Sequence, residues 1–341
     1  MKALLKKKKE QRADIFKIAA WEMGISPTVV EKDFWVCVVL DYLFQKSRFK
    51  ERFIFKGGTS LSKCYDAIKR FSEDIDLVIK WDSLGFADEE VYQNRSITQT
   101  GLFERRMNDA AAFFIEKELK KDLDENLLPQ MRCLRFLDSP DPLVLLVGYE
   151  TLFPDPYLTG AVKLEMGAVA AKGPTILRKI KPYYNQFVNL PYDDEEIEVL
   201  AVSIARTFWE KVLILYAESN RPEGKMVPQR YSRHYYDVFM IHRSSHFESI
   251  LKKPGLFEEV RRFKSRYYRA AWSRLEEADL ATITLLPNAM RIEELRKDYE
   301  SMKIMLFGEK PSFGEIMDEL RYLEEELHVL NNSGKPLSLN E

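Results

Sequence analysis

Residues 55–77 read FKGGTSLSKCYDAIKRFSEDIDL, and this stretch decides the fold. The apolar residues before the two glycines predict a short buried strand, residues 60–69 predict a helix, and residues 75–79 predict a second strand. Glycines between a strand and a helix let a phosphate approach the backbone, and the N-terminus of the helix offers that anion its unpaired N–H groups. The pattern therefore predicts a phosphate cradle made of Gly57, Gly58, Thr59 and Ser60.

Asp74 and Asp76 lie at the start of the second predicted strand. Because strand side chains alternate, both carboxylates point to one face, where they repel each other unless a cation lies between them. Carboxylate oxygens are the ligands that Mg²⁺ or Mn²⁺ prefers. A cradle, a helix and an Asp-x-Asp strand form the arrangement of polymerase-β-like nucleotidyltransferases, in which metal ions assist the departure of pyrophosphate. The alternative interpretation is a glycine turn followed by two surface aspartates.

A third carboxylate is sought on the strand predicted at 161–167. Alternation there places Val162, Leu164 and Met166 toward the core, and Lys163 and Glu165 on the opposite face. If this strand neighbours the aspartate strand, Glu165 completes a three-carboxylate metal site and can accept the proton of the nucleophile. The alternative is an ordinary exposed face of an antiparallel strand.

Outside the motif, strands and helices are mixed up to about residue 190, and helices alone follow. The chain has 341 residues, which suggests about two domains. We expect an α+β nucleotidyltransferase domain with N-terminal helices over 1–190 and a helical domain over 191–341. The acidic residues 193–196 predict the start of a long helix through Tyr216, and the polar residues 82–100 predict a loop or lid.

Composition restricts the environment and the partners. The net charge of -2, from 52 basic and 54 acidic residues, excludes a globally basic nucleic-acid coat, so a polyanion needs a local basic patch. Three widely spaced cysteines indicate a reducing compartment. The N-terminus is too polar for a signal peptide, and no apolar run is long enough to span a membrane. We expect a cytoplasmic protein without membrane contact.

Residues 70–77, RFSEDIDL, strongly resemble the most recognisable motif of the AbiEii/AbiGii nucleotidyl transferase toxin family, which includes the MenT toxins. Four further segments resemble the family across nearly the whole chain: 30–36, 206–211, 232–237 and 306–313. The resemblance implies a nucleotidyltransferase domain, a helical C-terminal domain and the use of an NTP. It also implies a toxin role in a bacterial abortive-infection or toxin–antitoxin pair with a cognate antitoxin. Arg70, which opens the motif, is a further candidate for substrate binding.

The same resemblance gives roles to charged residues of the second half. Lys211, in an amphipathic helix, is expected to neutralise the β- and γ-phosphates. Arg233 and Asp237 lie four residues apart on one helical face, so Arg233 can hold a phosphate and Asp237 can orient Lys211 or act as a base. This chain carries His234 where related sequences often carry an aspartate. We expect Lys211→Ala to lose turnover with a nearly unchanged thermal midpoint.

Residues 261–274 interleave basic side chains with Tyr267, Tyr268 and Trp272. Such a stretch can bind RNA through phosphate contacts and base stacking. The spacing of Phe263, Tyr267 and Ala270 equally fits an ordinary core stripe of a helix.

We therefore expect a Mg²⁺- or Mn²⁺-dependent nucleotidyltransferase, with Asp74 and Asp76 at the metal. The acceptor is RNA, as at the 3′ end of a tRNA, or a protein side chain. The alternatives are a nucleotide- or RNA-binding protein without turnover and a small-molecule nucleotidyltransferase of the aminoglycoside type. The identity of the NTP, the acceptor, the oligomeric state, the choice of Glu165 or Asp237 as third carboxylate and the mode of action of an antitoxin stay open.

Overall fold

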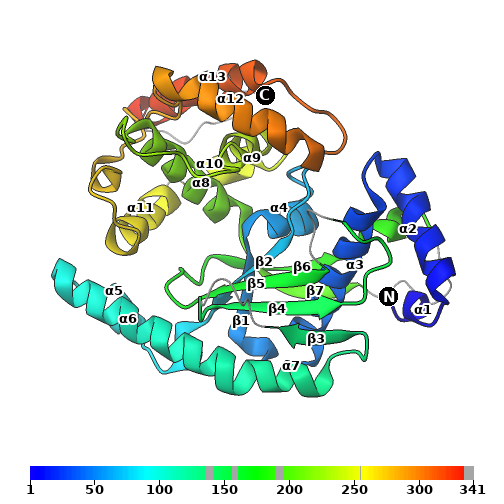
Figure 1. The fold of residues 1–341 in the computed structure, drawn as a ribbon. Helices are drawn as coiled ribbons and strands as arrows, with labels where there is room; N and C mark the ends of the chain where they lie inside the picture. Colours follow the sequence, from blue (N-terminus) through cyan, green and yellow to red (C-terminus); the bar gives the residue numbers. More distant parts are fainter. Residues whose placement is uncertain (135–140, 156–159, 189–195, 254, 334–341) are drawn as a thin grey trace. The chain divides into compact units, whose positions relative to one another are not determined.

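The computed structural model describes residues 1–134, 141–155, 160–188, 196–253 and 255–333, and the chain forms two compact units (Figure 1). The first unit comprises Met1–Asp66 and Arg70–Val202, and the second comprises Ala67–Lys69 and Ser203–Glu341. The boundary predicted at residue 190 precedes the last strand of the first unit, whereas the division in the structure follows that strand.

Seven strands of the described residues form one mixed sheet in the first unit (Figure 1). In sequence order they are β1 (Phe53–Lys56), β2 (Asp74–Ile79), β3 (Met131–Leu134), β4 (Val144–Tyr149), β5 (Ala161–Gly167), β6 (Thr175–Ile180) and β7 (Ile197–Val202). Across the sheet the order is β3-β4-β5-β2-β1-β7-β6. The pairs β1–β7 and β2–β5 are parallel and the other four are antiparallel. The predicted α+β class is confirmed.

The long helix predicted from residue 193 to Tyr216 is wrong in its first part. Residues 193–195 lie outside the described residues, β7 follows them, and the helix α8 begins only at Ile204. Ile197, Val199 and Ala201 are buried, because β7 lies between β1 and β6 within the sheet. Pairing with two neighbours therefore overrides the acidic helix-start signal upstream.

The helices of the first unit include those predicted at the N-terminus. They are α1 (Lys2–Leu5), α2 (Lys9–Met23), α3 (Pro27–Asp41), α4 (Gly57–Tyr65), α5 (Asp88–Tyr92), α6 (Ile97–Phe114) and α7 (Lys120–Asn126). Gly24 ends α2 with φ +65°, a left-handed conformation that glycine adopts without strain. Ser26 caps α3, because its hydroxyl accepts the Thr28 N–H at 3.2 Å. α7 packs beside β3 (Figure 1).

Residues 82–100 are not the loop that was predicted. A short 3₁₀ helix (Trp81–Leu84), α5 and the start of α6 occupy most of this segment. The Ser96 hydroxyl accepts the Gln99 N–H at 3.3 Å, and the Gln99 side chain accepts the Ser96 N–H at 3.2 Å. This reciprocal capping box starts α6 without any apolar periodicity before it, which explains why the sequence pattern missed it.

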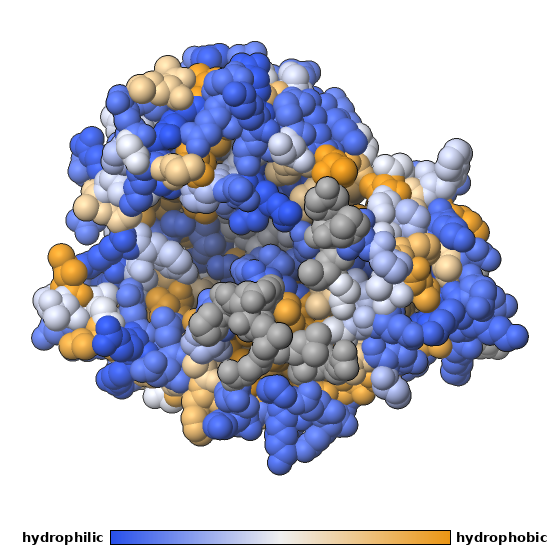
Figure 2. Space-filling view, viewed as in Figure 1, coloured by the Kyte–Doolittle hydropathy of each residue, from blue (hydrophilic) through white to orange (hydrophobic). Residues whose placement is uncertain are grey.

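In the described residues of the second unit, all the regular secondary structure is helical. Its helices are α8 (Ile204–Ser219), α9 (Arg233–His242), α10 (Phe247–Leu251), α11 (Gly255–Tyr267), α12 (Ile292–Met302) and α13 (Phe313–Ser333). Within the described residues, every helix is too short or too polar to cross a membrane. On the face drawn in Figure 2, hydrophilic residues predominate and hydrophobic ones form small scattered groups.

Candidate active site

The predicted carboxylates share one face of two neighbouring parallel strands. β2 and β5 pair in a register that places Asp74 opposite Lys163 and Asp76 opposite Glu165. Because side chains alternate, these four residues point to the same side, and all four are half-buried. Glu165 was a candidate third carboxylate only if its strand neighbours the strand of Asp74 and Asp76, and the structure shows that β5 and β2 are neighbours.

Lys163 lies among these carboxylates and forms an ion pair with Glu165. The pKa of Lys163 is raised: burial lowers it, but the hydrogen bond to Glu165 and the charges of Asp74 and Asp76 outweigh that effect. Burial raises the pKa of Asp74, while the ammonium of Lys163 lowers it and Glu165 raises it further. Within the described residues, no three His, Cys, Asp or Glu side chains converge closely enough to hold a metal ion together.

The predicted phosphate cradle begins α4 and lies directly against the carboxylate strand. Gly57 has φ +78°, and a Cβ added there would lie 2.5 Å from Cγ of Asp76. A Cβ on Gly58 would lie 2.6 Å from Nη2 of Arg70. Gly57 therefore requires glycine, because its backbone is left-handed and a Cβ would overlap Asp76, whereas at Gly58 the guanidinium of Arg70, the end of a flexible side chain, would have to move. The helix starts at the glycines themselves, earlier than the expected start at residue 60.

The hydroxyl groups of the cradle bind the backbone of the protein. Thr59 Oγ1 donates to the carbonyl oxygens of Asp74 at 2.5 Å and Ser72 at 3.3 Å. Ser60 Oγ donates to the carbonyl oxygen of Gly57 at 3.2 Å. Both side chains are buried, so Thr59 ties the start of α4 to the start of β2, and the backbone N–H groups are the part of the cradle suited to an anion.

In the second unit, Lys211 of α8 and Asp237 of α9 form a buried ion pair. Lys211 Nζ lies 2.7 Å from Asp237 Oδ2, and the two side chains are 9% and 0% exposed. Nδ1 of His234 lies 3.5 Å from the same ammonium. Arg233, the first residue of α9, is exposed. The structure therefore brings Lys211 and Asp237 together, as expected if Asp237 orients the lysine.

The basic and aromatic stretch 261–274 contributes to the core of the second unit. Phe263 and Tyr267 are buried, in agreement with the core-stripe interpretation for these two residues. Arg262, Tyr268 and Arg269 are exposed, so the same stretch also presents basic and aromatic side chains to solvent.

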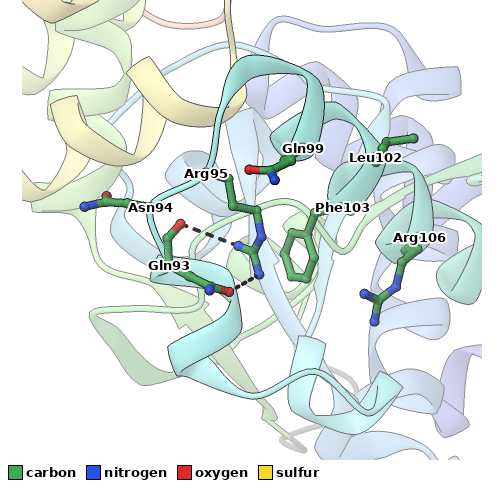
Figure 3. Close-up of a pocket in the computed structure, with 7 residues that line it drawn as sticks. All are labelled: Gln93, Asn94, Arg95, Gln99, Leu102, Phe103 and Arg106. Atoms are coloured by element: carbon green, nitrogen blue, oxygen red, sulfur yellow. Dashed lines mark hydrogen bonds between the residues drawn. The ribbon is translucent and has the colours of Figure 1, made fainter.

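A pocket of about 300 Å³ lies at the junction of α5 and α6 (Figure 3), and in the part of the chain that the structure describes it is lined by none of the predicted site residues. It is lined by Gln93, Asn94, Arg95, Gln99, Leu102, Phe103 and Arg106. Arg95 has a structural role there: its guanidinium donates to the Gln93 side chain at 2.8 Å and lies 4.0 Å from the centre of the Phe103 ring. These contacts hold the turn between the two helices.

The sequence model of the nucleotidyl transferase AbiEii toxin family, a family of Type IV toxin–antitoxin systems, matches residues 39–319. The chain belongs to this family. The match confirms the resemblance of the 70–77 motif, and it makes the chain a nucleotidyltransferase toxin by family. Segment 30–36 lies outside the matched residues.

The solved structures similar to this AbiEii-family chain include two of low sequence identity. One is MenT4, a nucleotidyltransferase toxin from Mycobacterium tuberculosis H37Rv, with 16% identity, a TM-score of 0.49 and 95% of each chain covered. The other is a candidate nucleotidyltransferase from H. pylori, with 14% identity and a TM-score of 0.44, covering 91% of this chain and 100% of that one. A comparison with curated protein sequences finds no match.

The sequence of this AbiEii-family chain did not predict a role for Lys163, which lies among the carboxylates of β2 and β5. It also did not predict the buried ion pairs that α3 forms. Lys163 was placed on the correct face, but its pairing with Glu165 depends on side-chain conformation. Lys32 pairs with Glu73 and Asp33 pairs with Lys63, and both pairs join residues far apart in the chain. The available signal was the run of three charges at 31–33 inside an otherwise apolar helix, because such residues are rarely buried without a partner.

Cys64, on the cradle helix, is expected to behave as an unreactive thiol. Burial raises its pKa to about 12, so the thiolate is scarce at neutral pH. Alkylation of the native protein by iodoacetamide should therefore keep accelerating up to pH 10, measured by mass spectrometry of the peptide that contains Cys64. The same peptide in denatured protein should level off near an ordinary thiol pKa of about 8.5. A plateau near pH 9 in the native protein would contradict this expectation.

Proposed function

We propose that this chain is a metal-dependent nucleotidyltransferase toxin that transfers a nucleoside monophosphate from an NTP to an acceptor and releases pyrophosphate. The acceptor is a hydroxyl of RNA, as at the 3′ end of a tRNA, or of a protein side chain. One observation carries the proposal: the glycine cradle of α4 is packed against Asp76, on the face that also holds Asp74 and Glu165. A bound phosphate and the two aspartates beside it repel each other, and a Mg²⁺ held by one or two carboxylates together with substrate phosphates removes that repulsion.

The residues present fit a divalent cation. Asp74 and Asp76 offer hard oxygen ligands on one face, and Mg²⁺ is commonly held by one or two carboxylates together with substrate phosphates. A third protein ligand is therefore not required, although Glu165 is the nearest candidate on the neighbouring strand. When bound, Mg²⁺ or Mn²⁺ would supply charge neutralisation and polarise the phosphoryl oxygens.

The chain's own groups have distinct roles in this proposal. The N–H groups at Gly57 and Gly58 bind phosphate oxygens, and Arg70 behind Gly58 adds positive charge. In the second unit, Lys211, held by Asp237, and the exposed Arg233 are further candidates for binding phosphate. Glu165 or Asp237 is the candidate acceptor of the proton of the attacking hydroxyl. A cognate antitoxin is proposed from the family, whose members are toxins of Type IV systems.

The test uses each of the four labelled NTPs with Mg²⁺, total cellular RNA and a protein extract as acceptors. We expect label on RNA or protein with the wild-type protein, and a loss of at least about 100-fold with Asp76→Ala. Asp14→Ala, at an exposed carboxylate of α2, is the matched control and should retain full transfer. Equal labelling by Asp76→Ala would overturn the site assignment. No transfer from any NTP, with nucleotide binding retained, would indicate a binding protein without turnover.

A further inference from the structure

α3 is a helix that is buried on nearly every side and yet carries three consecutive charges. Glu31, Lys32 and Asp33 are each at most 2% exposed. Three adjacent residues on a helix spread over more than half of its circumference, so they contact different parts of the first unit. Burying a charge is costly unless it is paired and hydrogen-bonded. The partners of these residues therefore indicate what the burial achieves.

Asp33 binds the helix of the phosphate cradle. Its Oδ1 lies 2.7 Å from Nζ of Lys63 on α4, and both side chains are 3% exposed. Its other oxygen accepts the backbone N–H of Tyr183 at 2.6 Å. The Lys63 ammonium also lies 4.0 Å from the centre of the Tyr183 ring. These contacts fix the C-terminal half of α4 against α3.

Lys32 binds the residue that precedes the carboxylate strand. Its Nζ lies 2.9 Å from Oε2 of Glu73, and the side chain of Lys32 is almost fully buried. Glu73 is adjacent in sequence to Asp74, where β2 begins. The pair therefore fixes the start of β2 against α3, and it also neutralises a carboxylate next to the two aspartates.

Glu31 binds the segment that follows β4. Its carboxylate accepts the Thr151 hydroxyl at 2.7 Å and the backbone N–H groups of Leu152 at 2.8 Å and Phe153 at 3.3 Å. α3 itself packs against β5 and β7, so this contact anchors α3 within the first unit. Because α3 is held in place, it can in turn fix the positions of α4 and β2, which its other two charged residues contact.

These side-chain contacts connect α3, α4 and β2 to one another in pairs. Thr59 connects α4 to β2, Lys63 connects α4 to α3, and Glu73 connects β2 to α3. Replacing a buried ion pair with apolar residues is often neutral for stability, so stability alone does not account for these pairs. Their partners on α4 and beside β2 belong to the two elements that must be aligned for phosphate and carboxylates to meet.

We propose that Lys32 and Asp33 are positioning residues, which set the phosphate cradle and the carboxylate strand at a fixed distance for nucleotide transfer. The kinetic part of this inference rests on the proposed function. The reason for a large effect is geometric, because displacement of reacting groups by about 1 Å can lower a rate by about 100-fold.

The test uses two neutral double variants, Asp33→Asn with Lys63→Met and Lys32→Met with Glu73→Gln. Single variants leave a buried charge without its partner and can unfold the protein, whereas the double variants remove both charges at once. The control is Glu218→Gln with Arg221→Met, an equally buried ion pair of the second unit, with side chains 4% and 7% exposed. Lys32→Arg keeps the positive charge, so it tests whether the charge alone is enough to retain kcat.

Two readouts are measured on the full-length chain. We expect kcat for nucleotide transfer to fall about 10- to 100-fold in both double variants, with a much smaller change in KM for the NTP. We also expect faster hydrogen exchange of the amides in α4 and β2, by mass spectrometry, while other strands of the sheet keep their protection. Lys32→Arg should retain most of the wild-type kcat, and the control pair should change neither readout in the first unit.

The proposal is overturned if kcat and the exchange of α4 and β2 stay at wild-type levels, or if exchange accelerates equally throughout the first unit. The second outcome would assign the pairs to general stability. If the wild-type protein transfers no nucleotide at all, the proposed function fails. Hydrogen exchange alone then decides whether Lys32 and Asp33 hold the two elements in place.

Discussion

Gly57→Ala should lose nucleotide transfer almost completely and reduce the free energy of unfolding by about 3 kcal/mol. Two effects act at the same residue. The left-handed backbone, with φ +78°, strains any side chain, and the added Cβ would overlap the carboxylate of Asp76. The aspartate must then move, or α4 must separate from β2. Thermal and denaturant unfolding, together with transfer assays, measure both effects.

Gly101→Ala is the matched control for Gly57→Ala. Gly101 lies in α6 with φ below zero, and a Cβ there would meet no atom within 4 Å. This variant should be neutral or more stable by up to about 1 kcal/mol, because alanine has the higher helix propensity. If Gly57→Ala behaves like Gly101→Ala, the described packing of the cradle against Asp76 is incorrect.

Lys211→Ala should reduce the free energy of unfolding by about 3–5 kcal/mol in addition to lowering transfer. The sequence alone suggested an almost unchanged thermal midpoint, but the structure changes that expectation. Asp237 is fully buried and its oxygen lies 2.7 Å from the lysine ammonium, so removal of the lysine leaves a buried carboxylate without its cation. Urea unfolding of the purified variant measures the loss.

Two further variants distinguish the effect of Lys211 and Asp237 on stability from their effect on nucleotide transfer. Lys211→Met combined with Asp237→Asn removes both charges and should recover most of the stability without recovering transfer. Lys17→Ala removes an exposed lysine that pairs with Asp14 and should change stability by no more than about 0.5 kcal/mol. A stable Lys211→Ala protein would show that Asp237 is neutral or solvated in the fold.

The local part of the site could be read from the sequence, because it depends on strand alternation. The pattern at 74–79 correctly placed Asp74 and Asp76 on one face, and the pattern at 161–167 placed Glu165 on the matching face. The pairing of those two strands remained conditional, since a run of alternating residues does not specify its neighbour. The glycines were recognised as a cradle, but their contact with Asp76 is a tertiary feature.

The errors arose where tertiary pairing overrides local signals. β7 follows an acidic run that resembles a helix start, and its short apolar stretch fits a helix or a strand equally well. No strand is predicted over residues 175–180, because β6 lies at the edge of the sheet and exposes Ile176 and Leu177, so it lacks the usual alternation. The ion pairs of α3 join residues 30 and 41 positions apart, and no local pattern specifies such partners.

The segment Ala67–Lys69 has a consequence for the order in which the protein is made. These residues connect α4 to β2 but belong to the second unit. The N–H of Lys69 donates to the Tyr236 hydroxyl at 3.3 Å, and its carbonyl accepts the Phe307 N–H at 2.9 Å. During synthesis on a ribosome, Tyr236 and Phe307 are translated long after Lys69, so these two hydrogen bonds form only after most of the chain has been made. The connection between the cradle helix and the carboxylate strand of the toxin therefore gains these two contacts only late in translation, whereas the hydrogen bonds of Thr59 between α4 and β2 need no residue of the second unit.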